Sequence, residues 1–134
     1  MEIETPDVPV QPSQSEIEIL QSLWARKTAT VRQIHNDIKA TRDIGYTTTL
    51  KQIQRMVEKK LVEKVSNETR SHTYAAILKP TRTRKSLLER LIDSAFGGSS
   101  NALVMQALGQ AKPSKAEIEE IRVLLDKLEE DQRG

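Results

Sequence analysis

The stretch GYTTTLKQIQRMVEKKLVEK, residues 45–64, decides the fold of this chain. It runs from a turn-like Gly-Tyr through three threonines into helix-forming residues, and it ends in residues typical of a strand. Threonine is a poor helix former but a good N-terminal cap, so the run predicts a helix that begins at Thr47 or Thr48, one of which caps it. Gly45, which can adopt a positive φ, is expected to close the preceding turn, and Thr49 is expected to pack inward.

The predicted helix has an apolar and a polar face. Four apolar residues at helical spacing are expected to form the buried stripe: Leu50, Ile53, Met56 and Val57. Four polar residues, also three and four positions apart, are expected to project from another side: Thr48, Lys51, Gln52 and Arg55. No acidic residue precedes Glu58 in this helix.

The polar face has the residue types that read DNA. Arg55 can pair with guanine through two hydrogen bonds and Gln52 with adenine, whereas Lys51 suits a phosphate. Thr47 and Thr48 lie at the helix start, where hydroxyls and free N–H groups bind phosphate. The alternative is an ordinary amphipathic helix with a solvated face, and the neighbouring elements decide between the two interpretations.

Two capping boxes upstream predict two more helices. Ser13 with Glu16, and Thr30 with Gln33, have the spacing at which each side chain bonds the other residue's backbone N–H. We expect helices over 14–26 and 31–41. Their apolar residues recur at helical spacing: Ile17, Leu20, Leu23 and Trp24 in the first helix, and Val31, Ile34 and Ile38 in the second.

A β-hairpin is predicted downstream, with strands near 62–66 and 72–77 and a tip at 67–71. Arg70 stands at the tip and is expected to contact a phosphate. Lys64 and His72 are weaker candidates, because a basic hairpin is common on proteins of many kinds.

Three further helices are predicted after Pro80, separated by Gly97-Gly98 and by Pro113 with a third capping box, Ser114 and Glu117. Short helices with wide apolar faces bury those faces poorly alone, so we expect them to pair with a second copy of the chain. The alternative is that they fold back on the first domain. The residues expected at the dimer interface are Leu87, Leu88, Leu91, Ile92, Leu103, Val104, Leu108, Ile118, Ile121, Leu125 and Leu128.

Charge and composition limit the possible functions. The net charge of +2 hides a middle section, residues 12–85, with 15 Lys and Arg against 7 Asp and Glu, which suits a polyanion. The chain has no cysteine, two histidines without metal-ligand spacing, and no nucleophile or phosphate-loop motif. We therefore expect no metal, no cofactor and no enzymatic activity. The sequence also lacks a membrane span and a signal peptide, so a soluble protein of the bacterial cytoplasm is expected, with no membrane insertion.

Three short helices followed by a hairpin are typical of a winged helix, whose third helix enters the major groove. The predicted fold is mainly α with a small β-hairpin wing, followed by a three-helix dimerisation domain. The predicted parts are a disordered arm over 1–11, a DNA-binding domain over 12–80 and a dimerisation domain over 81–134. The rival function is a winged-helix module that binds protein and not DNA.

The segments SEIEILQSLW, TVRQIHNDI, GYTTTLKQIQRMVEKKLVEK and IEEIRVLLDKL, in this order, resemble the penicillinase-repressor family. The resemblance covers about residues 12–128. It implies a homodimeric repressor at a palindromic operator, often its own, with contacts from Thr47, Thr48, Lys51 and Arg55.

The resemblance also implies how repression ends. In the best-known members a membrane sensor-protease is activated and the dimerisation domain is then cut at an Asn-Phe bond, so the partner here is expected to be such a sensor or an intracellular protease. The similar segment is LVMQALG, where Gln106 and Ala107 replace Asn-Phe. The chain does not resemble the copper-responsive branch, which has a cysteine metal site.

Overall fold

The computed structural model describes residues 11–66 and 72–134, and the chain divides into two compact units, 1–88 and 89–134. The boundary falls inside α4 (Pro80–Ala95), so each unit is described by itself. The predicted arm over 1–11, except Gln11, and the wing tip with Arg70 lie outside the described residues.

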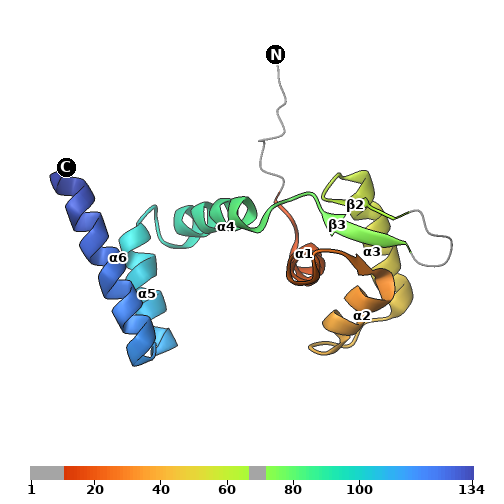
Figure 1. The fold of residues 1–134 in the computed structure, drawn as a ribbon, viewed down its shortest axis with the longest axis horizontal. Helices are drawn as coiled ribbons and strands as arrows, with labels where there is room; N and C mark the ends of the chain where they lie inside the picture. Colours follow the sequence, from red (N-terminus) through yellow and green to blue (C-terminus); the bar gives the residue numbers. More distant parts are fainter. Residues whose placement is uncertain (1–10, 67–71) are drawn as a thin grey trace, which may run out of the picture. The chain divides into compact units, whose positions relative to one another are not determined.

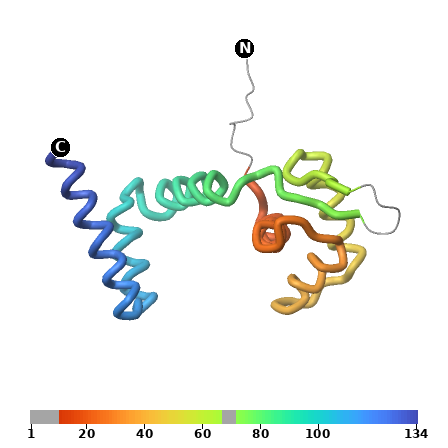
Figure 2. The backbone as a smooth tube through the Cα atoms, viewed as in Figure 1, coloured from red at the N-terminus to blue at the C-terminus, as the bar shows by residue number. Residues whose placement is uncertain are grey.

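The first unit is a winged helix (Figure 1). Its elements follow the predicted order, with one strand added: α1 (Gln14–Arg26), β1 (Ala29–Thr30), α2 (Val31–Lys39), α3 (Tyr46–Glu58), β2 (Val62–Lys64) and β3 (Thr73–Ala76). The tube in Figure 2 shows the two wing strands running beside each other next to α3. The predicted fold class, mainly α with a small β-hairpin wing, is confirmed.

The predicted capping boxes of α1 and α2 are both present, since Ser13 with Glu16 and Thr30 with Gln33 exchange side-chain bonds with backbone N–H groups. The bounds of α1 match the prediction. Helix α2 ends at Lys39 rather than Thr41, with Ala40 at its C-terminal cap.

The sheet has three antiparallel strands in the order β1-β3-β2. Thr30 of β1 lies opposite Thr73, and Lys64 of β2 lies opposite Tyr74. The sequence did not predict β1, because its two residues are too few to show an alternating pattern. The pairing joins the start of α2 to the wing and thereby fixes the helices relative to the hairpin.

The core of this unit lies between α1, α2, α3 and the sheet. The fully buried side chains include Ile19, Leu20 and Leu23 of α1, Ile34 of α2, Ile53 and Met56 of α3, and Leu61 and Val62 at the wing. Trp24 packs against this cluster, and its Nε1 donates to the Leu78 carbonyl over 2.9 Å. This position agrees with the place of Trp24 among the predicted apolar residues of the first helix.

One residue of the predicted buried stripe of α3, Val57, is exposed in the structure. Val57 is 36% exposed, whereas Thr49 is fully buried. The buried stripe of α3 runs through Thr49, Ile53 and Met56, at spacings of four and three, so the next position turns outward. Apolar spacing alone placed Val57 in the stripe, because the stripe was drawn through apolar residues and did not include Thr49.

A polar cluster ties α1 to α2. The carboxylate of Asp37 accepts two hydrogen bonds from Arg26, each of 2.8 Å, and one of 2.6 Å from the Ser22 hydroxyl. The bonds from Arg26, followed by that from Ser22, lower the pKa of Asp37 from 3.8 to about 2.

This cluster predicts a loss of stability in acid. Because the folded state lowers the pKa of Asp37, its contribution is present above about pH 4, the ordinary range of an aspartate, and is lost as the pH falls through about 2. Urea midpoints measured from pH 5 to pH 2 are expected to fall less for Asp37→Asn than for the wild type. If the urea midpoints of the two proteins fell equally with pH, this role for Asp37 would be contradicted.

The second unit contains the end of α4, then α5 (Ser100–Ala111) and α6 (Lys115–Arg133), which run in opposite directions (Figure 1). Gly97 and Gly98 separate α4 from α5 with positive φ angles of 56° and 85°. The third predicted capping box, Ser114 with Glu117, starts α6. None of the residues 84–134, all of which the structure describes, is buried.

Candidate DNA-binding surface

Helix α3 begins one residue before the threonine run. Its first residue is Tyr46 and its N-terminal cap is Gly45, which makes no side-chain hydrogen bond and has a φ of −81°. The prediction that Thr47 or Thr48 caps the helix is therefore wrong, and Gly45 does not use the positive φ that a glycine can adopt. Since the turn needs no left-handed residue, Gly45 supplies an extended cap, and both threonines lie inside the first turn with exposed side chains.

The third threonine has a structural position. Thr49 is fully buried, its Oγ1 donates to the Gly45 carbonyl over 3.4 Å, and the same oxygen lies 3.4 Å from His35 Nδ1. The expectation that Thr49 packs inward is confirmed. Thr49 thus connects the start of α3 to α2.

We predict that Thr49→Val lowers the free energy of unfolding by about 1 kcal/mol, since valine keeps the volume but loses both polar contacts of a buried hydroxyl. Denaturant titration measures the change. DNA affinity at temperatures where the variant is folded is expected to stay at the wild-type level, because Thr49 faces inward. A large loss of affinity in a fully folded variant would contradict this assignment.

The exposed face of α3 differs from the predicted one by one exchange: it contains Gln54 instead of Gln52. Five polar residues of this face are exposed: Thr47, Thr48, Lys51, Gln54 and Arg55. Gln52, predicted to project with them, is half-buried, and its Nε2 donates to the Ser15 hydroxyl of α1 over 3.4 Å. At about 100° per residue, Lys51 lies at the middle of this face with Thr47 and Arg55 on either side of it, while 52 turns toward α1. Helical spacing from Lys51 could have identified Gln54.

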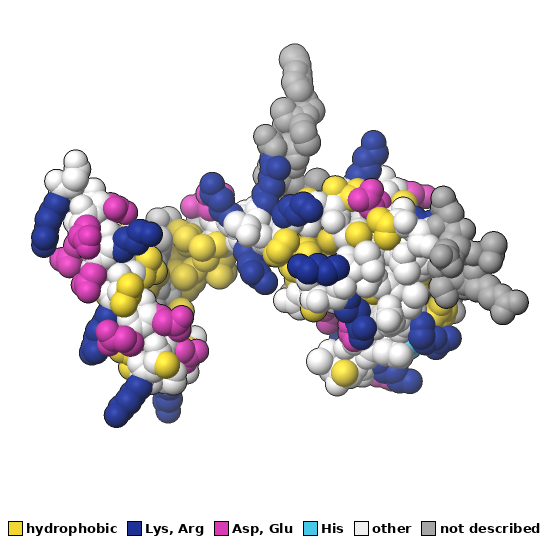
Figure 3. Space-filling view, in the orientation of Figure 1, with side chains coloured by type: hydrophobic (Ala, Val, Ile, Leu, Met, Phe, Trp, Pro, Cys, Tyr) yellow, Lys and Arg dark blue, Asp and Glu magenta, His cyan; other side chains and the backbone are white. Residues whose placement is uncertain are grey.

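The cations of this face are not neutralised by neighbours. Lys51 and Arg55 form no ion pair with any residue in 11–66 or 72–134, whereas other basic side chains nearby do. Arg42 binds Glu18 at 2.8 Å, and Lys59 binds the buried Glu16 at the same distance. Burial raises the pKa of Glu16, but hydrogen bonds from Lys59 and Ser13 outweigh it, so the pKa lies below its usual value. Figure 3 shows more basic than acidic side chains on the visible face of the first unit.

The possible cleavage segment lies inside a helix. Gln106 and Ala107 are both exposed and belong to α5. No group of three or more metal-ligating side chains occurs within the described ranges. None of the helices in the described part of the chain is long and apolar enough to cross a membrane.

The sequence of the whole winged-helix unit and the following helices matches a known family. The model of the penicillinase repressor family aligns with residues 12–127. The chain belongs to the penicillinase repressor family. The resemblance drawn from the four sequence segments is thereby confirmed.

Relatives of this chain are transcriptional regulators by name. It is 33% identical to the transcriptional regulator BlaI of Mycobacterium tuberculosis over 90 residues, which are 66% of this chain and 62% of BlaI. It is 24% identical to the methicillin resistance regulatory protein MecI of Mammaliicoccus sciuri over 115 residues, which are 86% of this chain and 93% of MecI. A solved structure of a Lactococcus lactis ZitR mutant aligns with a TM-score of 0.43 at 19% identity, over 94% of this chain and 78% of ZitR.

Proposed function

We propose that this protein is a homodimeric transcriptional repressor that binds a palindromic operator through α3 and the wing. The observation that carries the proposal is the exposed face of α3 in a penicillinase repressor family member. This face has no acid before Glu58, and its two cations form no ion pair with residues in 11–66 or 72–134. Arg55 and Gln54 have the hydrogen-bonding groups that read guanine and adenine. Thr47, Thr48 and Lys51 are suited to phosphates.

Gln54 replaces Gln52 in this proposal. The amide of Gln52 is engaged with Ser15, and its side chain is half-buried between α3 and α1. Gln54 is exposed beside Arg55. Lys64 and His72 are exposed on the wing strands or next to them. They are proposed, together with Arg70, to contact flanking phosphates.

Dimerisation is proposed for the C-terminal helices. No residue of the second unit, 89–134, is buried. Its apolar side chains are therefore left in water, which disfavours the isolated unit. Leu88, Leu91, Val104, Ile118, Leu125 and Leu128 are between 37% and 54% exposed. The other predicted interface residues are half-buried: Leu87, Ile92, Leu103, Leu108 and Ile121. A second copy would cover these faces, and a two-fold axis would place two α3 helices on a palindrome.

Proteolysis is proposed as the step that relieves repression. The Gln106-Ala107 bond lies in the middle of α5, so a protease would need α5 to open locally. The proposed partner is a membrane sensor-protease or an intracellular protease, and the proposed location is the bacterial cytoplasm.

The test is selection of DNA from a random-sequence duplex library, followed by gel shift of the enriched duplex. Enrichment of a palindrome and a steep fall of affinity with salt, with a slope of roughly −0.9 per phosphate neutralised, would support the proposal. No enrichment and no salt-sensitive binding would favour the protein-binding module instead. Sedimentation of a monomer at micromolar concentration would contradict the dimer.

A further inference from the structure

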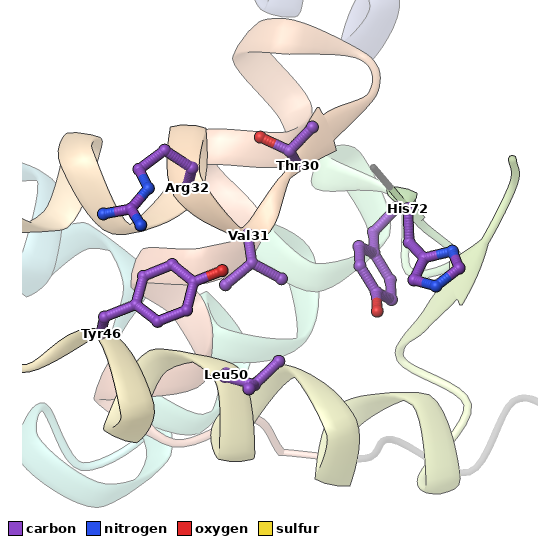
Figure 4. A pocket seen from close by; sticks show the side chains of 7 residues that line it. Thr30, Val31, Arg32, Tyr46, Leu50 and His72 are labelled. Atoms are coloured by element: carbon purple, nitrogen blue, oxygen red, sulfur yellow. The ribbon is translucent and has the colours of Figure 1, made fainter. Parts of the chain in front are cut away.

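A hollow of about 270 Å³ lies beside the start of α3, between the first turn of α2 and strand β3 (Figure 4). Apolar Val31 and Leu50 line part of it. Arg32 and Tyr46 lie on one side and His72 on the other. Its described lining residues include two cationic or protonatable side chains and no acid. The hollow therefore suits an anion.

Arg32 is held in place but not neutralised. Its guanidinium carbon lies 4.4 Å from the centre of the Tyr46 ring, a cation–π contact that restricts the side chain. Arg26 and Arg42, by contrast, bind carboxylates at 2.8 Å. Arg32 makes no ion pair with any residue that the structure describes, so its charge remains available to an incoming group.

Two other features of the hollow favour a phosphate. The first turn of α2, fixed by the Thr30 capping box, presents the positive end of the helix dipole. Tyr74 lines the hollow and is 6% exposed. A phenol is protonated at neutral pH, and burial followed by the nearby Tyr46 raises the pKa of Tyr74, so its hydroxyl can donate to a phosphate.

The hollow lies next to the exposed face of α3. Tyr46, which lines the hollow, directly precedes Thr47 on α3. A DNA strand that contacts Thr47 would therefore run close to the hollow. An open hollow beside the reading helix accommodates a continuous phosphodiester chain.

We infer that this hollow is a second binding site for the DNA backbone. In it, Arg32, held against Tyr46, binds a phosphate next to the bases that face α3. The inference rests on the proposed function. The contact carries no sequence information, but it fixes the register of α3 on the duplex. His72 extends the same contact toward the wing.

The test compares Arg32→Ala with Lys39→Ala, which removes the same charge from the other end of α2. Binding is measured on the duplex selected by the wild type and on a mixed-sequence duplex of equal length. Arg32→Ala is expected to weaken both complexes about tenfold and to make the salt slope less steep by about 1. Arg32→Lys is expected to keep the wild-type slope. Lys39→Ala is expected to change neither quantity.

Replacement of single phosphates by neutral methylphosphonates locates the contact. One position is expected at which the replacement weakens binding of the wild type but not of Arg32→Ala, because the variant has already lost that contact. Inorganic phosphate at matched ionic strength is expected not to compete; competition would assign the hollow to a free anion and overturn the inference.

The inference can fail separately from the proposed function. If Lys51→Ala weakens binding while Arg32→Ala behaves like Lys39→Ala, the hollow does not bind a phosphate. In that case α3 still binds DNA. If every methylphosphonate position affects the wild type and Arg32→Ala equally, the inference is likewise wrong. If the wild type selects no DNA, the inference falls together with the proposed function.

Discussion

Leu125→Glu is expected to convert the protein to a monomer and to weaken binding to the selected palindromic duplex by about 10²–10⁴-fold. Leu125 is 54% exposed on α6, in the stripe that also contains Ile118, Ile121 and Leu128. If this stripe meets its counterpart in a second chain, a carboxylate there would be buried without a partner in each subunit. Two-fold symmetry places the change twice in one interface.

The loss of DNA affinity follows from the loss of the second α3. In a dimer, binding of one half-site makes binding of the other intramolecular, and this advantage disappears when the chains separate. Sedimentation velocity measures the oligomeric state, and gel shift measures the affinity. The isolated first unit should remain folded, because its core contains no residue of α5 or α6.

Val123→Glu is the matched control. Val123 is 59% exposed on the same helix, but it lies two residues from Leu125 and therefore roughly 160° away around the axis. It should remain a dimer and keep wild-type affinity. A dimeric Leu125→Glu variant with unchanged affinity would show that this stripe does not join the two chains.

The sequence predicted the helices well because each has a local signal. Three capping boxes, at Ser13, Thr30 and Ser114, appear as predicted, and the paired glycines after α4 break the chain with positive φ angles. These signals depend on residues three or four apart, which a single sequence displays. Strand β1 depends instead on pairing with Thr73 and Tyr74, more than 40 residues away, and has no local signal.

The reading face of α3 was harder to predict because rotation about a helix depends on tertiary packing. The buried stripe runs through Thr49, which was expected to pack inward, but the same rotation turns Val57 outward, where an apolar residue was not expected. The same rotation carries Gln52 toward Ser15 and brings Gln54 into the exposed face. Lys51 and Arg55 lie near the centre of the face, so a small error in rotation left them correctly placed.

Arg55→Ala is expected to weaken binding to the selected duplex by about 1–3 kcal/mol and to relax sequence preference at one base pair in each half-site. Arg55 is exposed and forms no ion pair within the described residues, and alanine favours helix, so the fold should be unaffected. The loss should be smaller on a mixed-sequence duplex, because there only the charge is lost. Selection repeated with the variant identifies the relaxed base pair.

Arg55→Lys separates charge from hydrogen-bond geometry. Lysine keeps the positive charge but lacks the planar fork that matches the O6 and N7 atoms of guanine. The variant should keep the wild-type salt slope and yet select a relaxed sequence, whereas Lys51→Ala should weaken all sequences alike and reduce the slope by about 1. If Arg55→Ala selected the wild-type sequence with undiminished preference, Arg55 would be a backbone contact, and base reading would have to come from Gln54 or from the threonines at the start of α3.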